Sequence, residues 1–479
     1  MKLTLTNDEV QIFHDQLAES NKQFSEQYKD DAFERQPVHT VYGGAHLFKA
    51  AFTSKLGGIG LNTLNTYAPN YAVFAKILGI PGAESLPGVS TELTDLTAAL
   101  DADSEAVRKV FPAAWLAYTV YKRVVHKLNT EPIEDNRIDF EDGYGNRPDE
   151  EEDGHAVNAA DEVAKGMEAG TLSPFIGIRI KSFTDECKVR SIRTLDLFLT
   201  RLAEKTDSKL PSNFVITLPK VTIAEQVAAL AQILDKMEKK LGYAEKSLKL
   251  EIMIETTQSI INNRGENTVP LLVAAGDGRC RSAIFGTYDY TASCNITAAH
   301  QSHTHPASDF ARHVLQASSA GTGITISDGA TTIMPIGPHR PPKDGQLTNL
   351  QIAENRAVVN SAWKLHYDNI MHSLRHAYYQ GWDLNPGQLP VRYAAVDTFF
   401  LTGLQDSSAR LDAFLNKAAQ ATLVGNTFDD AATGQGLLNF FLRGLACGAI
   451  TEEEALATGI TLAELRSRSF VQIVTNRTQ

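Results

Sequence analysis

The sequence predicts an α/β fold of the barrel type, in which parallel strands alternate with helices. Short runs rich in β-branched residues recur between helical patterns along the 479-residue chain. Several runs end in a charged residue, which is typical of barrels because the carboxyl ends of their strands build the active site. An open doubly wound sheet is the alternative. It would bind a ligand at one switch point, and no G-x-G-x-x-G motif follows the first run.

Seven runs are candidate strands, and the segments around them look helical. The runs are "VHTVYG", "RIDFED", "FIGIRI", "FVITLPK", "LKLEIMIET", "RSAIFGTYD" and "GITISDG". We expect an N-terminal helical segment over residues 1–36 and a catalytic barrel domain over 37–400. A helical insertion over about 62–130 follows the first strand, as in "AAWLAYTVYKRVVHKL". Residues 401–479 are expected to form a wholly helical C-terminal subdomain.

Composition points to a small-molecule enzyme in a reducing compartment. The hydrophobic fraction is 43% and the charged fraction 21%, as in ordinary globular proteins. The net charge of −12 argues against nucleic acid or an anionic membrane as partner. Cys187, Cys280, Cys294 and Cys447 show no paired spacing, and no apolar stretch is long enough to span a membrane. We therefore expect a cytoplasmic protein.

Two carboxylates close apolar runs and form the candidate metal pair. Glu255 ends "IMIE" and Asp289 ends "FGTYD". Mg²⁺ prefers a few carboxylate oxygens and leaves its other positions to water and substrate. Either residue alone would more often cap a helix or pair with a cation, but together at one barrel rim they favour a metal site.

Two cations lie at the ends of other runs. Arg179 in "IGIRIKSF" can grip a substrate carboxylate or carbonyl with two hydrogen bonds, or form a structural ion pair with Glu141 or Asp142. Lys220 in "LPKVTIAEQ" can also meet a substrate carboxylate. A Schiff-base role for Lys220 would need a depressed pKa, and nothing in the sequence indicates one.

The order of the motifs resembles one known family. "VYGGAHLFKAA", "IDFEDGYG", "IGIRIKS", "LPKVTIAEQV", "IMIETTQSI", "FGTYDYTAS" and "GWDLNPGQLPVRYA" follow one another as in the citrate lyase beta-subunit-like and malyl-CoA lyase family. That family belongs to the phosphoenolpyruvate/pyruvate barrel superfamily, with the class II aldolases. The resemblance covers roughly residues 38–400. It implies a (β/α)₈ TIM barrel, Mg²⁺ (or Mn²⁺) as cofactor, enolate chemistry and a homo-oligomer.

The resemblance also implies roles for particular residues. Glu255 and Asp289 look like the metal ligands, and Arg179 looks like the substrate-binding arginine. Asp139, Glu141 and Asp142 match a D-x-E-D signature whose acids border the metal. The candidate catalytic residues are therefore Arg179, Asp142 and Glu141, and the candidate substrate-binding residues are Arg179, Lys220 and Asp139.

These residues favour a Mg²⁺-dependent carbon–carbon lyase or aldolase acting on a 2-oxo acid through an enolate. Asp142 or a metal-bound hydroxide is the candidate general base. The first alternative is a malate-synthase-like condensation of an acyl-CoA, or a phosphoenolpyruvate-directed transfer. The second is a non-catalytic scaffold or regulatory subunit, which has little need of such residues at three strand ends.

A histidine-rich segment offers a rival site. "AAHQSHTHPASDFARHVL" holds His300, His303, His305 and His313, whose spacing could supply zinc ligands. The alternative is that His305 and Pro306 open a helix through "ASDFARHVLQASSA", with His313 on that helix.

Overall fold

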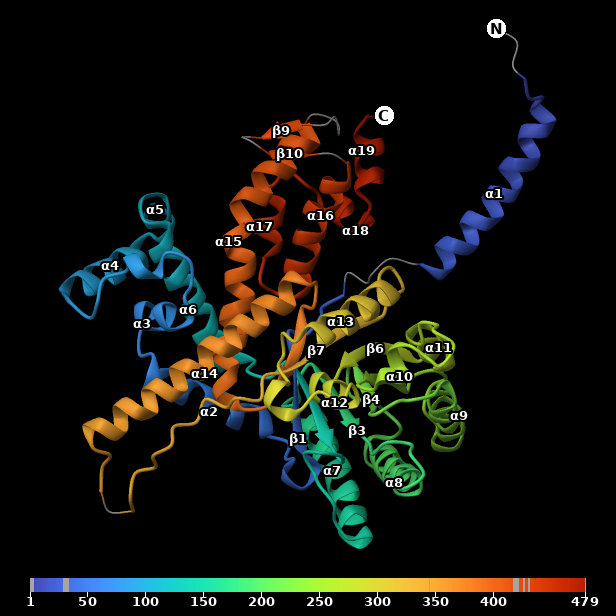
Figure 1. The fold of residues 1–479 in the computed structure, drawn as a ribbon, viewed down its shortest axis with the longest axis horizontal. Coiled ribbons are helices and arrows are strands. Elements are labelled where there is room, and N and C mark those ends of the chain that lie inside the picture. Colours follow the sequence, from blue (N-terminus) through green and yellow to red (C-terminus); the bar gives the residue numbers. More distant parts are fainter. Residues whose placement is uncertain are drawn as a thin grey trace.

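The computed structural model describes residues 4–28, 34–343, 345–416, 422–424, 427–429 and 431–478. Eight parallel strands close into a barrel in chain order, with β8 pairing back onto β1 (Figure 1). The strands are β1 (His39–Gly44), β2 (Asp135–Asp139), β3 (Phe175–Arg179), β4 (Phe214–Leu218), β5 (Lys249–Ile254), β6 (Cys280–Phe285), β7 (Thr325–Ala330) and β8 (Gln380–Asp383). The predicted (β/α)₈ barrel is confirmed.

Helices separate the strands and form the outer layer. Within the barrel region they are α2 (Phe52–Tyr67), α3 (Tyr71–Leu78), α4 (Thr91–Ala102), α5 (Ser104–Val110), α6 (Pro112–Thr130), α7 (Asp149–Ala169), α8 (Lys188–Thr206), α9 (Ala224–Leu241), α10 (Thr257–Ile260), α11 (Val269–Ala275), α12 (Thr287–Ser293), α13 (Pro306–Ser319) and α14 (Asn349–Arg375). Short 3₁₀ turns are η1 (Ala45–Leu47), η2 (Ala83–Ser85), η3 (Ala298–His300) and η4 (Pro386–Gln388). The predicted helical insertion over about 62–130 thus comprises the end of α2 and helices α3 to α6.

The ends of the chain add further helices. α1 (Asn7–Gln27) precedes the barrel and has no buried residue, and Figure 1 shows it directed away from the barrel. After β8 come α15 (Leu389–Asn416), α16 (Ala431–Ala446), α17 (Glu452–Leu456), α18 (Leu462–Ser467) and α19 (Phe470–Thr478). An antiparallel hairpin, β9 (Thr422–Val424) and β10 (Thr427–Asp429), lies between α15 and α16. The predicted C-terminal helical subdomain is confirmed, and this hairpin is an addition that the helical pattern did not predict.

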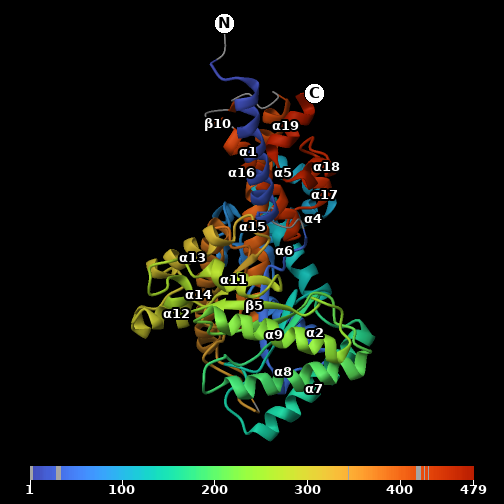
Figure 2. The same cartoon turned by 90° about the vertical axis from the view of Figure 1, so that its right-hand side faces the viewer.

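Two hydrophobic cores divide the molecule. One lies between the β2–β6 side of the barrel and helices α7, α8 and α9. The other joins the insertion to the C-terminal helices, and it includes Phe74 of α3, Val120 of α6, Trp363 of α14, Phe400 of α15 and Phe441 of α16. In Figures 1 and 2 the C-terminal helices rise beside α6 on one side of the barrel. The long insertion is thus the surface on which the C-terminal helices pack, and the domain boundaries themselves stay a prediction.

The sequence missed the eighth strand. β8 is only four residues long, Gln380 to Asp383, and contains no β-branched residue. It is nevertheless required to close the barrel, because it pairs with both β7 and β1. No helix among the described residues is both long enough and apolar enough to cross a membrane.

Candidate active site

The barrel places four of the predicted residues at or just after the carboxyl ends of its strands. Asp139 is the last residue of β2 and Arg179 the last residue of β3. Lys220 follows β4 by two positions, and Glu255 comes directly after β5. Asp289 does not close a strand as expected. β6 ends four positions earlier, and Asp289 lies in the first turn of α12.

Arg179 is held rigidly inside the barrel. Its Nε and Nη2 atoms donate to the two oxygens of Asp139 at 2.7 and 2.6 Å. The guanidinium carbon lies 4.6 Å from the centroid of the Tyr42 ring and 5.3 Å from that of Trp382. Planar donors stacked on aromatic faces lose little freedom when they bind. The third guanidinium nitrogen, Nη1, lies 3.2 Å from Glu141 Oε2.

Asp139, a predicted substrate-binding residue, serves as the anchor of this arginine. Besides Arg179, its oxygens accept hydrogen bonds from the backbone amides of Glu141 at 3.0 Å and Gly143 at 2.7 Å. A Cβ atom on Gly143 would lie 2.6 Å from Asp139 Oδ2, so glycine is required for this close approach. With its side chain fully buried and both oxygens engaged, Asp139 positions Arg179 in this structure.

Glu141 and Asp142 both contact Lys220. The ammonium of Lys220 donates to Glu141 Oε1 and, at 3.0 Å, to Asp142 Oδ2. Burial raises the pKa of Glu141, and the neighbouring Asp142 adds to this, while Arg179 and Lys220 oppose it. Asp142 is exposed, and although burial works against it, Lys220 lowers its pKa.

The charge of Lys220 is stabilised rather than suppressed. Burial acts to lower its pKa, but Glu141, Glu255 and Asp289 together raise it. A Schiff-base lysine needs a depressed pKa so that its amine is free to attack. The electrostatics therefore favour Lys220 as a permanent cation.

Glu255 lies in a pocket shaped by backbone. The amide of Lys220 donates to its Oε1 at 2.6 Å, from a residue with the left-handed φ of 50°. Non-glycine residues seldom adopt this conformation, and such outliers gather at functional sites. A Cβ atom on Gly286 would lie 2.4 Å from Glu255 Oε2. Burial raises the pKa of Glu255 to about 8, with the charge of Asp289 as the next contribution.

The donor set at this end of the barrel suits a hard cation. Arg179 and Lys220 lie there among five carboxyl groups, those of Asp139, Glu141, Asp142, Glu255 and Asp289. Glu141 is occupied by Lys220 and Arg179, which leaves Glu255 and the exposed Asp289 as the residues that can hold an ion. Mg²⁺ is usually bound by one or two carboxylates and keeps several waters, so this pair fits it.

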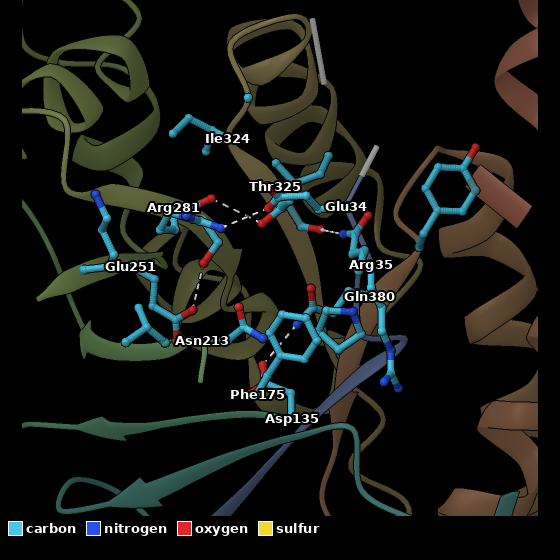
Figure 3. A pocket seen from close by; sticks show the side chains of 18 of the residues that line it. Glu34, Arg35, Asp135, Phe175, Asn213, Glu251, Arg281, Ile324, Thr325 and Gln380 are labelled. Carbon is cyan, nitrogen blue, oxygen red and sulfur yellow. Dashed lines mark hydrogen bonds and ion pairs between the residues drawn. The ribbon is translucent and has the colours of Figure 1, made fainter. Parts of the chain in front are cut away.

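A cavity of about 1070 Å³ lies at the opposite end of the barrel (Figure 3). Its lining includes the first residues of six strands: Asp135, Phe175, Phe214, Lys249, Thr325 and Gln380. Several charged groups in it are paired, as Arg281 is with Glu34 at 3.4 Å. The chemistry-bearing residues lie at the other end of the strands, where barrel enzymes carry their active sites.

The four histidines of the rival site do not converge. His300 is exposed, and His305 caps α13 by accepting from the amide of Ala307. His303 is buried against Ser373 Oγ at 2.9 Å, and His313 lies on α13. The predicted helix opened by His305 and Pro306 is confirmed.

Sequence reasoning missed the aromatic partners of Arg179. Tyr42 points inward from β1, and Trp382 lies in the unrecognised strand β8. The available signal was the position of Trp382 in "GWDLNPGQLP", within the motif order already noticed.

Several solved structures are similar to this chain at low sequence identity. A citrate lyase from Burkholderia xenovorans is 17% identical, with a TM-score of 0.50, over 71% of this chain and 92% of that one. The protein CitE from Mycobacterium tuberculosis, in complex with magnesium, acetoacetate and coenzyme A, is 13% identical, with a TM-score of 0.43, over 69% and 95% of the chains. A malate synthase from Haloferax volcanii, a lead(II) complex, is 14% identical, with a TM-score of 0.38, over 72% and 89%. The first of these supports the barrel fold.

No curated protein matches the sequence. One family model matches residues 17–473, which is nearly the whole chain. The chain therefore belongs to the family described as a domain of unknown function, DUF6986.

Proposed function

We propose that this protein is a Mg²⁺-dependent carbon–carbon lyase or aldolase that acts on a 2-oxo acid through its enolate. The observation that carries the proposal is Glu255, a buried carboxyl whose pKa is raised to about 8 beside the charge of Asp289. Two carboxylates kept close at the carboxyl end of a barrel are disfavoured unless a cation joins them. Mg²⁺, or Mn²⁺ in its place, would supply Lewis-acid polarisation of the substrate oxygens when bound there.

Arg179 would bind the substrate and stabilise the negative charge that develops on its oxygen. Its Nη1 atom meets Glu141 Oε2 at 3.2 Å, and a substrate carboxylate or enolate oxygen can replace that partner. The other two nitrogens, Nε and Nη2, keep their hydrogen bonds to Asp139. Donors that are already in place stabilise a developing oxyanion without reorganisation, which is the largest contribution in many enzymes.

Glu141 would move the proton. Its pKa is raised by burial, whereas the pKa of Asp142 is lowered by Lys220 against the effect of burial. A general base works best when its pKa lies near the working pH, so Glu141 is the better acceptor of the two. Release from Arg179 by the incoming substrate would free one oxygen of Glu141 for this role. Asp142 would then hold the ammonium of Lys220.

Lys220 would keep the site selective for anions. Its ammonium and the guanidinium of Arg179 both contact Glu141. A substrate with a carboxylate next to its carbonyl would satisfy one cation and the metal together. This arrangement supports a 2-oxo acid over a neutral ketone.

Deuterium exchange into the methyl group of pyruvate, followed by NMR, tests the proposal directly. The wild type should catalyse exchange only with Mg²⁺ or Mn²⁺ present, and Asp289→Asn should lose it. Asp161→Asn on α7 is a matched control, because Asp161 pairs with Arg201 on the outer helices. It should behave as the wild type.

Exchange that persists in chelator, or is equal in Asp289→Asn, would exclude Asp289 as a metal ligand. Absence of both exchange and Mg²⁺ binding in the folded wild type would overturn the lyase proposal. The non-catalytic alternative would then lead.

A further inference from the structure

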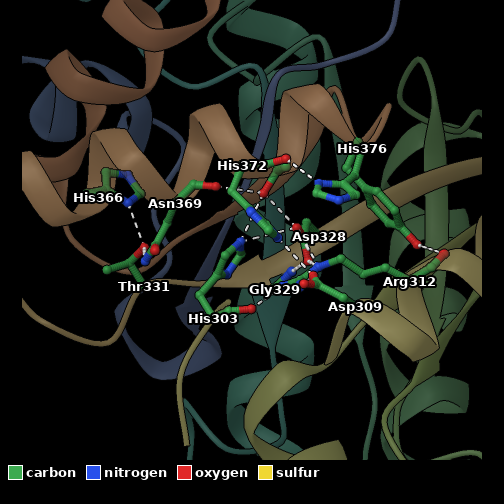
Figure 4. A network of polar contacts seen from close by, with 12 residues as sticks. His303, Asp309, Arg312, Asp328, Gly329, Thr331, His366, Asn369, His372 and His376 are labelled. Atoms are coloured by element: carbon green, nitrogen blue, oxygen red, sulfur yellow. Dashed lines mark hydrogen bonds and ion pairs between the residues drawn. The ribbon is translucent and has the colours of Figure 1, made fainter. Parts of the chain in front are cut away.

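A second group of metal-ligand residues lies outside the barrel, between α13 and α14. Ligand atoms of Asp309, His372 and His376 all lie within 4.8 Å of one another. Within the described residues, no other group of three or more His, Cys, Asp or Glu side chains has its ligand atoms this close together. Figure 4 shows the two histidines on one face of α14, with Asp309 facing them from α13. The barrel mouth shares none of these residues.

Helical spacing brings the two histidines together. Residues four apart lie one above the other on a helix, and the rings of His372 and His376 have centroids 4.3 Å apart. Nδ1 of His376 donates to the backbone carbonyl of His372 at 2.8 Å. This bond fixes the tautomer, because the proton sits on Nδ1 and the lone pair of Nε2 is left for a metal. Ligand histidines in proteins are commonly held in this way.

Asp309 is held in place by Arg312, which is itself fixed by Asp328. Its Oδ1 accepts from Arg312 Nη1 and contacts His372 Nε2, each at 2.8 Å. Arg312 is fully buried, and its Nε is fixed on the two oxygens of Asp328 in β7. Both contacts of Asp309 fall on the same oxygen, which leaves its second oxygen for an ion. Hydrogen-bonded carboxylates of this kind orient metal ligands.

The donor set selects a different metal from the one expected in the barrel. Imidazole nitrogens suit zinc and its neighbours in the first transition row, whereas Mg²⁺ prefers oxygen alone. In a tetrahedral zinc site with bonds of about 2.0–2.2 Å, ligand atoms lie about 3.3–3.5 Å apart. Small rotations of these half-buried side chains would bring the group from its present spacing to that geometry.

We propose that Asp309, His372 and His376 form a site for a divalent transition-metal ion, with Zn²⁺ the best fit. Three protein ligands leave the fourth position to water, or to His313, whose ring centroid lies 5.3 Å from that of His376. A bound ion would tie α13 to α14 and, through Arg312 and Asp328, to β7. This proposal is independent of the chemistry at the barrel mouth.

The test is metal binding by the full chain after chelation and dialysis. Zn²⁺ is titrated by calorimetry in excess Mg²⁺, which occupies oxygen sites, and Co²⁺ is titrated by visible absorption. His376→Asn retains a donor for the His372 carbonyl but lacks the Nε2 ligand. His372→Gln retains a donor toward Asp309. His300→Gln removes an exposed histidine outside the group and is the matched control.

The wild type and His300→Gln should bind one Zn²⁺ per chain, and Co²⁺ should give the intense bands of a tetrahedral complex. Each ligand variant should bind at least about tenfold more weakly and lose those bands. Circular dichroism would establish that the variants are folded. Equal affinity in all four proteins, or no saturable binding by the folded wild type, would overturn the site and leave these residues as a polar contact between two helices.

Discussion

Two buried arginines in the same barrel have opposite surroundings. Arg137 donates to both oxygens of Glu251 at 2.8 and 3.0 Å and also contacts Asp135. Arg179, one strand further on, is anchored on Asp139, but its Nη1 contacts Glu141, which Lys220 also contacts. The first arginine belongs to a network of buried groups, and the second to a network that extends to the partly exposed Lys220 and the exposed Asp142.

The difference appears in how the carboxylates are satisfied. Glu251 also accepts from the hydroxyls of Thr217 and Ser282, and although burial opposes it, Arg137 lowers its pKa. Burial still raises the pKa of Asp135 to about 6, so even this network is not without strain. At the other end, burial raises the pKa of Glu255 to about 8. The charges around Arg137 are thus matched by buried partners, whereas Glu255 lies at the end of the barrel where we propose that a metal ion binds.

The largest expected effect is on stability, at the buried network around Arg137. Arg137→Met should destabilise the protein by about 3–5 kcal/mol, because two buried carboxylates lose their cation. Urea unfolding followed by circular dichroism measures the change. Arg201→Met is the control, since Arg201 forms partly exposed pairs with Asp161 and Glu204, and about 1 kcal/mol or less is expected there. A similar loss in both variants would remove the distinction between the buried network and exposed ion pairs.

At the carboxyl ends of the strands, substitutions of Glu141 and Asp142 should lower activity to different degrees. Glu141→Gln should lower the rate of Mg²⁺-dependent pyruvate exchange about 10²- to 10³-fold, because the group with the raised pKa is lost. Asp142→Asn should lower it less than about fivefold, since exposed ion pairs contribute little. NMR exchange rates at saturating Mg²⁺ provide the measurement. The reverse order of the two variants would make Asp142 the base.

The anchored arginine should not tolerate a lysine. Arg179→Lys should slow exchange about 10²-fold, because an ammonium cannot hold Asp139 with two bonds and still present a third donor. The same assay on Arg201→Lys, on the surface of α8, should give the wild-type rate. Retention of most activity in Arg179→Lys would mean that positive charge alone is needed, without the fixed geometry.

The strands that have a repeating pattern of β-branched residues could be predicted from the sequence. The strand that depends on pairing with its neighbours in the barrel could not. Periodicity located seven strands and the cations and carboxylates after them, because strand ends carry function in barrels. It did not find β8, whose Gln380 and Gly381 lack any strand preference and pair only because the barrel must close. It also placed Asp289 on a strand, although Gly286 begins a new helix there.

Roles were harder to predict than positions. Asp139 matched a signature of site residues, yet its oxygens face Arg179 and two backbone amides, which no spacing in the sequence reveals. The histidine-rich segment suggested zinc, but the two histidines grouped with Asp309 are His372 and His376 on α14, about sixty residues further along. Only the packing of α13 against α14 brings Asp309 and His372 together.

The smallest expected effect is the contribution of Glu255 to the pH dependence of stability. In metal-free protein the pKa of Glu255 is about 8, above its ordinary value of 4.5. Between these values the folded state holds a proton that the unfolded chain has lost, so stability falls as pH rises from about 4.5 to 8. Glu255→Gln cannot titrate, and it should be more stable than the wild type by about 1–2 kcal/mol near pH 8.5 and by much less near pH 5.

Urea unfolding in chelator at both pH values measures this gain. Mg²⁺ should reverse the order near pH 8.5, because it stabilises only the chain that binds it. Glu204→Gln is the control, because it removes a carboxylate from the exposed face of α8 and should show no pH-dependent gain. Gln226→Glu would be unsuitable, because the Gln226 side chain accepts a hydrogen bond from the amide of Thr222. A wild type that is as stable as Glu255→Gln at high pH without metal would mean that Glu255 is already satisfied, and its surroundings would then resemble those of Glu251.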